Sequence, residues 1–112
     1  MTKRIALCDM NHTTVGIHAE CMPLGAGLIG SYLKKLFNSD IDVRIYKFPE
    51  DLTRDLYEGW VPDVLGAGMY SWNTNLDLHY AHHIKQCFPQ TLILVGGPDV
   101  PTEPDETRHF LA

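Results

Sequence analysis

The sequence is poor in cysteine and has no long apolar run. Its three cysteines, Cys8, Cys21 and Cys87, are widely spaced and form no CxxC pair, which argues against a disulfide framework or a structural zinc site. No stretch approaches the roughly 18–20 apolar residues that a membrane span needs, and the N-terminus lacks the features of a secretory signal peptide. We therefore expect a cytoplasmic protein with no membrane span, in which Cys8 and Cys87 are small core residues.

Basic residues are also scarce. The chain has 9 Lys and Arg against 14 Asp and Glu, which gives a formal net charge of −5, and the basic residues are scattered. Because phosphate binding needs clustered Lys and Arg, this balance argues against nucleic acid as a partner. Apolar residues make up 45% of the 112 residues, which is enough for the packed core of one domain.

Four short apolar runs, at residues 4–8, 42–48, 63–69 and 91–95, have the composition of β-strands. The first, third and fourth runs are apolar on both faces, as buried parallel strands are, whereas the second alternates and is typical of an edge strand. Helical patterns separate them: an apolar stripe of Leu24, Leu28, Tyr32 and Leu36, then residues 50–59 and 73–88, and a fourth helix from residue 104.

This alternation of strands and helices predicts an α/β fold. Right-handed crossovers give a Rossmann-like (flavodoxin-like), doubly wound parallel sheet with the strand order 2-1-3-4. Such a sheet usually has a fifth strand, so we expect residues 1–112 to be one domain and a fragment of a longer protein. The fourth strand is then an open edge, at which a second copy can pair to form a homodimer.

Ligands of such sheets bind beyond the carboxyl ends of the strands, near the point where the strand order reverses. The loop at residues 9–23, after the first strand, is long for a connection of this kind and carries His12 and His18. Long loops in compact domains are often functional, so this loop is a candidate ligand contact.

Two further loops leave the same predicted edge. Tyr70 and Trp72 offer flat apolar surface after the third strand, although Trp72 can instead pack under a neighbouring loop. Asn73 or Thr74 can cap the helix that follows. The paired Gly96 and Gly97 allow a ligand to approach the backbone closely, or form a tight turn.

Two other patterns are better explained structurally. Residues 25–30 match GxGxxG, but sixteen residues separate them from the first strand and they lie within a helical pattern, which favours close helix–sheet packing over dinucleotide binding. His79 and His83 stand four residues apart and can chelate a metal from one helix face. Without a third ligand, a solvated helix face is the favoured interpretation.

Over nearly the whole chain, the motifs in this order resemble the N-terminal cobalamin-binding domain of B12-dependent radical SAM proteins. The resemblance lies in the strand start at residues 4–7, the Pro-Leu-Gly helix start within 23–33, and the segments 48–52, 62–66, 70–73, 84–85 and 94–98. It implies cobalamin across the carboxyl strand ends, with its nucleotide tail along the sheet. The implied cofactor-binding residues are His12, Pro23, Leu24, Gly25, Tyr70, Ser71, Trp72, Gly96, Gly97 and Pro98.

The cobalt ligand is a separate question. The better-known cobalamin modules carry DxHxxG after the first strand, with the His as the lower axial ligand of cobalt. Here Asp9, His12 and Gly16 give one residue more in each gap, and the radical SAM relatives often lack a His ligand. His12 as a possible cobalt ligand is therefore a hypothesis drawn from the resemblance, with His18 as a second choice.

The resemblance also implies a division of labour. The family's catalytic half is a radical SAM domain with a CxxxCxxC motif for an iron–sulfur cluster and S-adenosylmethionine, and this chain has no such motif. Alone it is expected to bind rather than catalyse, with a radical SAM domain of the same parent chain as its partner and methyl transfer as the leading reaction. The alternatives are a nucleotide- or flavin-binding domain of an oxidoreductase and a ligand-free regulatory or interaction domain.

Overall fold

A computed structural model describes residues 2–10 and 24–112 of the chain. Four parallel strands form one sheet in the order β2-β1-β3-β4: β1 (Lys3–Cys8), β2 (Ile41–Tyr46), β3 (Val64–Gly68) and β4 (Leu92–Gly96). The structure thus confirms the predicted α/β, Rossmann-like sheet and its strand order. In the described part of the chain β4 is an edge strand, and pairing with a second copy there stays a prediction.

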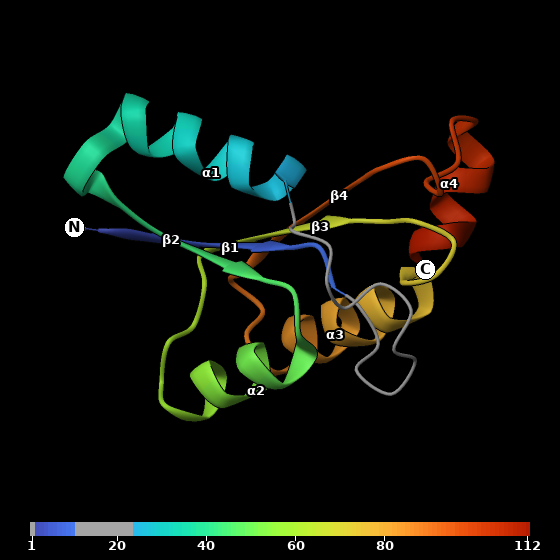
Figure 1. The fold of residues 1–112 in the computed structure, drawn as a ribbon. Helices are drawn as coiled ribbons and strands as arrows, with labels where there is room; N and C mark the ends of the chain where they lie inside the picture. The colour runs from blue at the N-terminus through green and yellow to red at the C-terminus, as the bar shows by residue number, and fades with distance from the viewer. Residues whose placement is uncertain (1, 11–23) are drawn as a thin grey trace.

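Helices cover both faces of this sheet (Figure 1). Helix α1 (Leu24–Phe37) lies on one face, and α2 (Pro49–Tyr57) and α3 (Thr74–Cys87) lie on the other. A short 3-10 helix, η1 (Asn38–Asp40), precedes β2, and α4 (Pro104–Leu111) lies near the carboxyl ends of β3 and β4. Among the described residues, no helix is both long enough and apolar enough to cross a membrane.

The core lies between the sheet and the pair α2 and α3. Alternate side chains of the two central strands point into it and are buried, namely Ala6, Cys8, Leu65 and Ala67, followed by Met69. The prediction for Cys8 is confirmed, but the one for Cys87 is wrong because Cys87 is exposed. Its sulfur lies 3.8 Å from Nε2 of the exposed His83, one turn earlier, so it belongs to the solvent face of α3.

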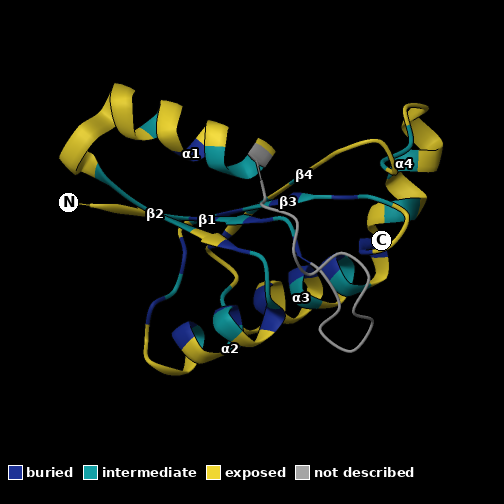
Figure 2. Cartoon of the chain, in the orientation of Figure 1, coloured by how far each residue is buried: buried dark blue, intermediate teal, exposed yellow. Residues whose placement is uncertain are grey.

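Helix α1 packs differently from the other two helices. The apolar stripe that predicts it does not face the sheet: Leu28, Tyr32 and Leu36 are 62%, 62% and 56% exposed. Figure 2 shows α1 as largely exposed, whereas α2 and α3 turn buried residues toward the sheet. The contact is made at Gly30, where a Cβ would lie 3.3 Å from the Ile45 side chain, so this glycine of the GxGxxG pattern does serve close packing.

Candidate functional site

A cavity of about 400 Å³ lies between the first turns of α1 and the carboxyl-terminal halves of β1, β3 and β4. We call it the strand-end cavity. Its mostly small or apolar lining consists of Leu7, Cys8, Asp9, Gly25, Ala26, Ile29, Gly66, Ala67, Gly68, Tyr70, Leu94, Val95, Gly96 and Gly97. Since β1 and β3 are neighbours at the point where the strand order reverses, the cavity lies where such sheets bind ligands.

Glycines open this cavity from the side of the sheet. Gly66 and Gly68 alternate with the buried Leu65 and Ala67, so they lie on the α1 face of β3. A Cβ at Gly66 would lie 3.2 Å from the Leu7 side chain, whereas one at Gly68 would come no closer than 3.8 Å to a neighbouring atom and one at Gly96 would meet nothing within 4 Å. Missing side chains, rather than a gap between poorly packed elements, therefore create the space.

Two aromatic rings border the cavity at the end of β3. Tyr70 lines it, and the rings of Tyr70 and Trp72 stack with their centroids 4.7 Å apart and their planes 5° from parallel. Trp72 is 53% exposed, so it is not part of the buried core. The stacked pair presents a flat apolar surface at the strand edge.

The turn after β4 packs against the end of β3. Gly97 has φ +105°, and a Cβ there would lie 2.5 Å from the carbonyl oxygen of Met69. The Met69 N–H donates to the Gly96 carbonyl at 2.7 Å, and the Asp99 N–H donates to the Met69 carbonyl at 3.2 Å. The tight-turn interpretation is thus confirmed at Gly97; both glycines also line the cavity, and close approach of a ligand there stays a prediction.

Asn73 precedes α3 but does not cap it with its side chain. The side chain is buried, and its amide nitrogen donates to the carbonyls of Met10 and Gly68 at 3.0 and 3.1 Å. Its oxygen accepts a hydrogen bond from the Tyr70 N–H at 2.8 Å. The predicted cap at Asn73 is therefore wrong, since these bonds between strand ends use its donors and its acceptor instead.

Asp9, which lines the cavity, and the buried Asp77 of α3 form an acidic pair. Asp77 of α3 is 1% exposed, and its carboxyl oxygens have no hydrogen-bond partner among the described residues. Burial first, and then the negative charge of Asp9, raise the pKa of Asp77 to about 8. Burial also raises the pKa of Asp9, against the charge of Lys47, and that of the Cys8 thiol. Asp77 is thus largely neutral at pH 7, and Cys8 is an unreactive thiol.

Two curated proteins match this chain over most of its length. The cobalamin-dependent radical SAM methyltransferase TokK of Streptomyces tokunonensis is 34% identical over 92 residues, or 74% of the chain. The 2-(S-pantetheinyl)-carbapenam-3-carboxylate methyltransferase of Streptantibioticus cattleyicolor is 32% identical over 107 residues, or 85% of the chain. The chain belongs to the cobalamin-binding domains of B12-dependent radical SAM proteins. It spans 13% and 15% of the lengths of these relatives. No protein-family model matches it.

The structure of this cobalamin-binding domain brings several predicted cofactor residues together. Gly25, Tyr70, Gly96 and Gly97 line the strand-end cavity, and Trp72 stacks on Tyr70. Ser71 and Pro98 are exposed at the same edge and are not part of the lining. His12 and Pro23 lie outside the described residues, as does the side chain of Leu24, the first residue of α1.

The sequence-based prediction missed the residues that make the cavity hollow. Gly66 and Gly68 lie inside a strand, where glycine marks a close approach of another group, and this signal was present in the Gly-Ala-Gly run. The bonds of Asn73 carry no comparable signal, because all three of their partners are backbone groups, on Met10, Gly68 and Tyr70.

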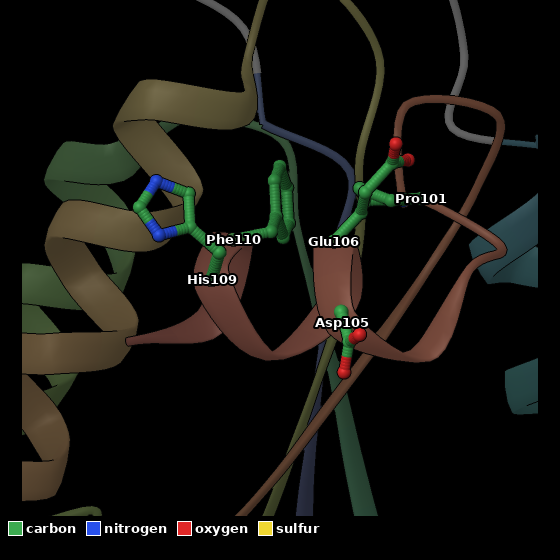
Figure 3. Close-up of a pocket in the computed structure, with 5 residues that line it drawn as sticks. All are labelled: Pro101, Asp105, Glu106, His109 and Phe110. Atoms are coloured by element: carbon green, nitrogen blue, oxygen red, sulfur yellow. The ribbon is translucent and has the colours of Figure 1, made fainter.

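A second hollow of about 510 Å³ lies on α4 and shares no lining residue with the strand-end cavity (Figure 3). Asp105, Glu106 and His109 contribute its polar groups, and all three residues are exposed. Asp105 forms an exposed ion pair with Arg108 at 3.6 Å.

In the described part of the chain, no group of three His, Cys, Asp or Glu side chains is placed to hold a metal ion. His79 and His83 of α3 are both exposed, as the favoured interpretation of a solvated helix face predicts.

Proposed function

We propose that this domain binds cobalamin at the carboxyl ends of its strands, with the nucleotide tail in the strand-end cavity. The observation that carries the proposal is the cavity itself, which Gly68 and Gly96 leave open beneath α1. Its volume of about 400 Å³ falls in the range of small-molecule sites, roughly 300–1,000 Å³, but is too small for the whole of cobalamin. The tail fits inside such a space, and the corrin ring then lies outside, over the strand ends.

The residues at the strand ends suit these two parts of the cofactor. Gly68 and Gly96 leave bare backbone against which a flat base can lie, and the apolar Leu94 and Ile29 border the same space. The exposed stacked ring of Trp72 offers broad apolar contact to a corrin face. Further contacts are assigned to Ser71 and Pro98 at the mouth of the cavity, and to Pro23, Leu24 and Gly25 at the start of α1.

We further propose that the whole protein is a B12-dependent radical SAM methyltransferase, since TokK is named as one and the second relative is named as a methyltransferase. Bound cobalamin supplies a cobalt centre that can carry a methyl group. This domain then holds and orients the cofactor, while a radical SAM domain of the same protein holds the iron–sulfur cluster and S-adenosylmethionine. A cytoplasmic location, which keeps Cys8 and Cys87 as thiols, belongs to the same proposal.

Equilibrium dialysis of the chain against hydroxocobalamin, NAD and FMN tests the binding proposal. We expect retention of hydroxocobalamin and of neither of the other two ligands. Retention of only NAD or FMN would overturn the proposal in favour of an oxidoreductase domain. Retention of none of the three would favour a regulatory or interaction domain without a ligand.

A filled cavity tests where the cofactor lies. Gly68→Val adds a side chain to open space inside the cavity, and we expect it to weaken hydroxocobalamin binding by about tenfold or more. The matched control is Gly27→Val on α1, where a Cβ also meets nothing within 4 Å but the residue does not line the cavity. Equal binding by the two variants would contradict the placement of the tail.

A further inference from the structure

The start of α3 joins segments that leave the sheet at two different strands. Asn73 is 0% exposed, and both protons of its amide are used, one on Met10 after β1 and one on Gly68 of β3. These two acceptors are carbonyl oxygens, which fixes the orientation of the amide, since its oxygen must then face the Tyr70 N–H. Asn73 thus holds the end of β1 at a set position relative to the end of β3.

The next residue extends the connection to β4. The Thr74 hydroxyl lies within hydrogen-bond distance of the Tyr70 carbonyl, at 2.7 Å, and of the Asp99 carboxylate. The Tyr70 carbonyl already accepts the N–H groups of Asn73 and Thr74, at 3.2 and 3.1 Å. Because a hydroxyl has one proton to donate, we assign that proton to Asp99, in the loop after β4. A hydrogen bond to a carboxylate is among the stronger kinds.

We propose that Asn73 and Thr74, which we call the α3 junction, are positioning residues for the cofactor. Neither lines the strand-end cavity, yet together they tie the ends of β1, β3 and β4 into one arrangement. Segments that are ordered before a ligand arrives lose less conformational entropy on binding, so the junction raises affinity without contacting the ligand. This inference rests on the proposed function, in which that ligand is cobalamin.

Thr74→Val is the sharpest variant, because it keeps the shape of the side chain and removes the hydroxyl. Thr91 provides a matched control at the opposite end of the sheet. It is 2% exposed, against 8% for Thr74, and its hydroxyl donates to the Pro62 carbonyl at 2.7 Å. Thr91→Val therefore makes the same chemical change at a buried site before β4, far along the strand from the junction. Thr74→Ser keeps the hydroxyl and serves as the rescue variant.

Three measurements are made on the wild type and the three variants. These are urea unfolding, equilibrium dialysis against hydroxocobalamin, and amide hydrogen exchange without cofactor. We expect Thr74→Val to bind about tenfold more weakly, Thr91→Val to stay within about twofold of the wild type, and Thr74→Ser to restore most of the affinity. Exchange at the Asp99 and Val100 amides should quicken in Thr74→Val, and at the Leu92 amide in Thr91→Val.

The outcomes separate this inference from the proposed function. A wild type that does not retain hydroxocobalamin overturns the proposed function, and the inference with it. If the wild type binds but Thr74→Val and Thr91→Val bind equally well, the positioning role alone is overturned. The positioning role is also overturned if Thr74→Val and Thr91→Val lose the same affinity for the same loss of unfolding free energy.

Discussion

The two faces of the sheet are built from the same four strands and differ in almost everything else. Toward α2 and α3, the strands turn buried side chains such as Ala6, Leu65 and Met69 into a closed core. Toward α1, they present Gly66 and Gly68 in β3, while Leu92 and Leu94 of β4 are 54% and 53% exposed. Because strand side chains alternate, one strand can stabilise the fold on one face and leave room for a ligand on the other.

The helices repeat this contrast. The α2 and α3 face carries a hydrogen-bonded polar cluster: the Tyr46 hydroxyl donates to Asp55 at 2.6 Å, and Arg44 donates to the same carboxylate at 3.1 Å. On the other face, α1 packs at Gly30 against Val43 and Ile45, over the β2 side of the sheet. We infer that the closed face supplies most of the stability and the open face most of the binding.

The largest expected effect on the free energy of unfolding comes from truncating a leucine to alanine, which we compare on the two faces. Leu65→Ala removes a side chain that is 1% exposed and should lower the free energy of unfolding by about 3 kcal/mol. Leu94→Ala, at a half-exposed position that lines the cavity, should lower it by less than about 1 kcal/mol but weaken hydroxocobalamin binding. Urea unfolding of both variants measures the difference, and similar losses would remove the contrast between the faces.

The two glycines after β4 give the next largest effect. Gly97→Ala combines a φ of +105° with a Cβ only 2.5 Å from the Met69 carbonyl oxygen, so it should cost about 3 kcal/mol of unfolding free energy. Gly96→Ala meets nothing within 4 Å and should leave stability nearly unchanged. Thermal or urea unfolding of the pair tests this, and a tolerated Gly97→Ala would show that the turn is not fixed by its contact with β3.

The buried Asp77 on the closed face should make the free energy of unfolding of the protein depend on pH. In the unfolded chain this carboxyl loses its proton near 3.8, whereas in the fold its pKa is about 8. Below pH 3.8 both states hold the proton, and as pH rises toward 8 only the folded state does, so stability falls over this interval. Within this interval the free energy of unfolding falls by up to about 1.4 kcal/mol per pH unit. After a discount for residual solvation, we expect it to fall by about 2 kcal/mol between about pH 5 and 7.

The variant Asp77→Asn should remove this slope, measured as urea unfolding at several pH values. The matched control is Asp55→Asn, because Asp55 is also buried but the hydrogen bond from Tyr46, followed by that from Arg44, lowers its pKa. Its contribution is present at neutral pH and is lost only in acid, below the range of the test. Asp55→Asn should therefore lower stability and keep the slope; an unchanged slope in Asp77→Asn would contradict the assignment.

The sequence predicts one face of this sheet better than the other. Apolar runs predict the strands, and their alternation with helices predicts the strand order, but the expected burial of the fourth run on both faces is wrong because Leu92 and Leu94 are about half exposed. The cavity is harder to predict, since glycine within a strand can mark a bulge, a close packing contact or open space for a ligand. The apolar stripe of α1 predicts the helix but not that its apolar side chains are exposed. The amino-acid sequence alone does not show that Asn73 donates a hydrogen bond to the Met10 carbonyl. These features depend on which segments meet in space.

The smallest expected effect is a change in the visible spectrum of bound cobalamin. It concerns His12, in the segment 9–23 that the sequence predicts to be a loop, rather than the strand ends. The hypothesis that His12 binds cobalt predicts that His12→Ala changes the visible spectrum of bound cob(III)alamin, because an axial nitrogen ligand is lost. His18→Ala, in the same loop, should leave the spectrum unchanged. Affinity should fall little in either variant if the tail is held in the strand-end cavity, as we propose, because neither histidine lines that cavity in the described part of the chain. An identical spectrum for the wild type and His12→Ala would exclude His12 as a ligand and leave the cofactor bound by the strand ends alone.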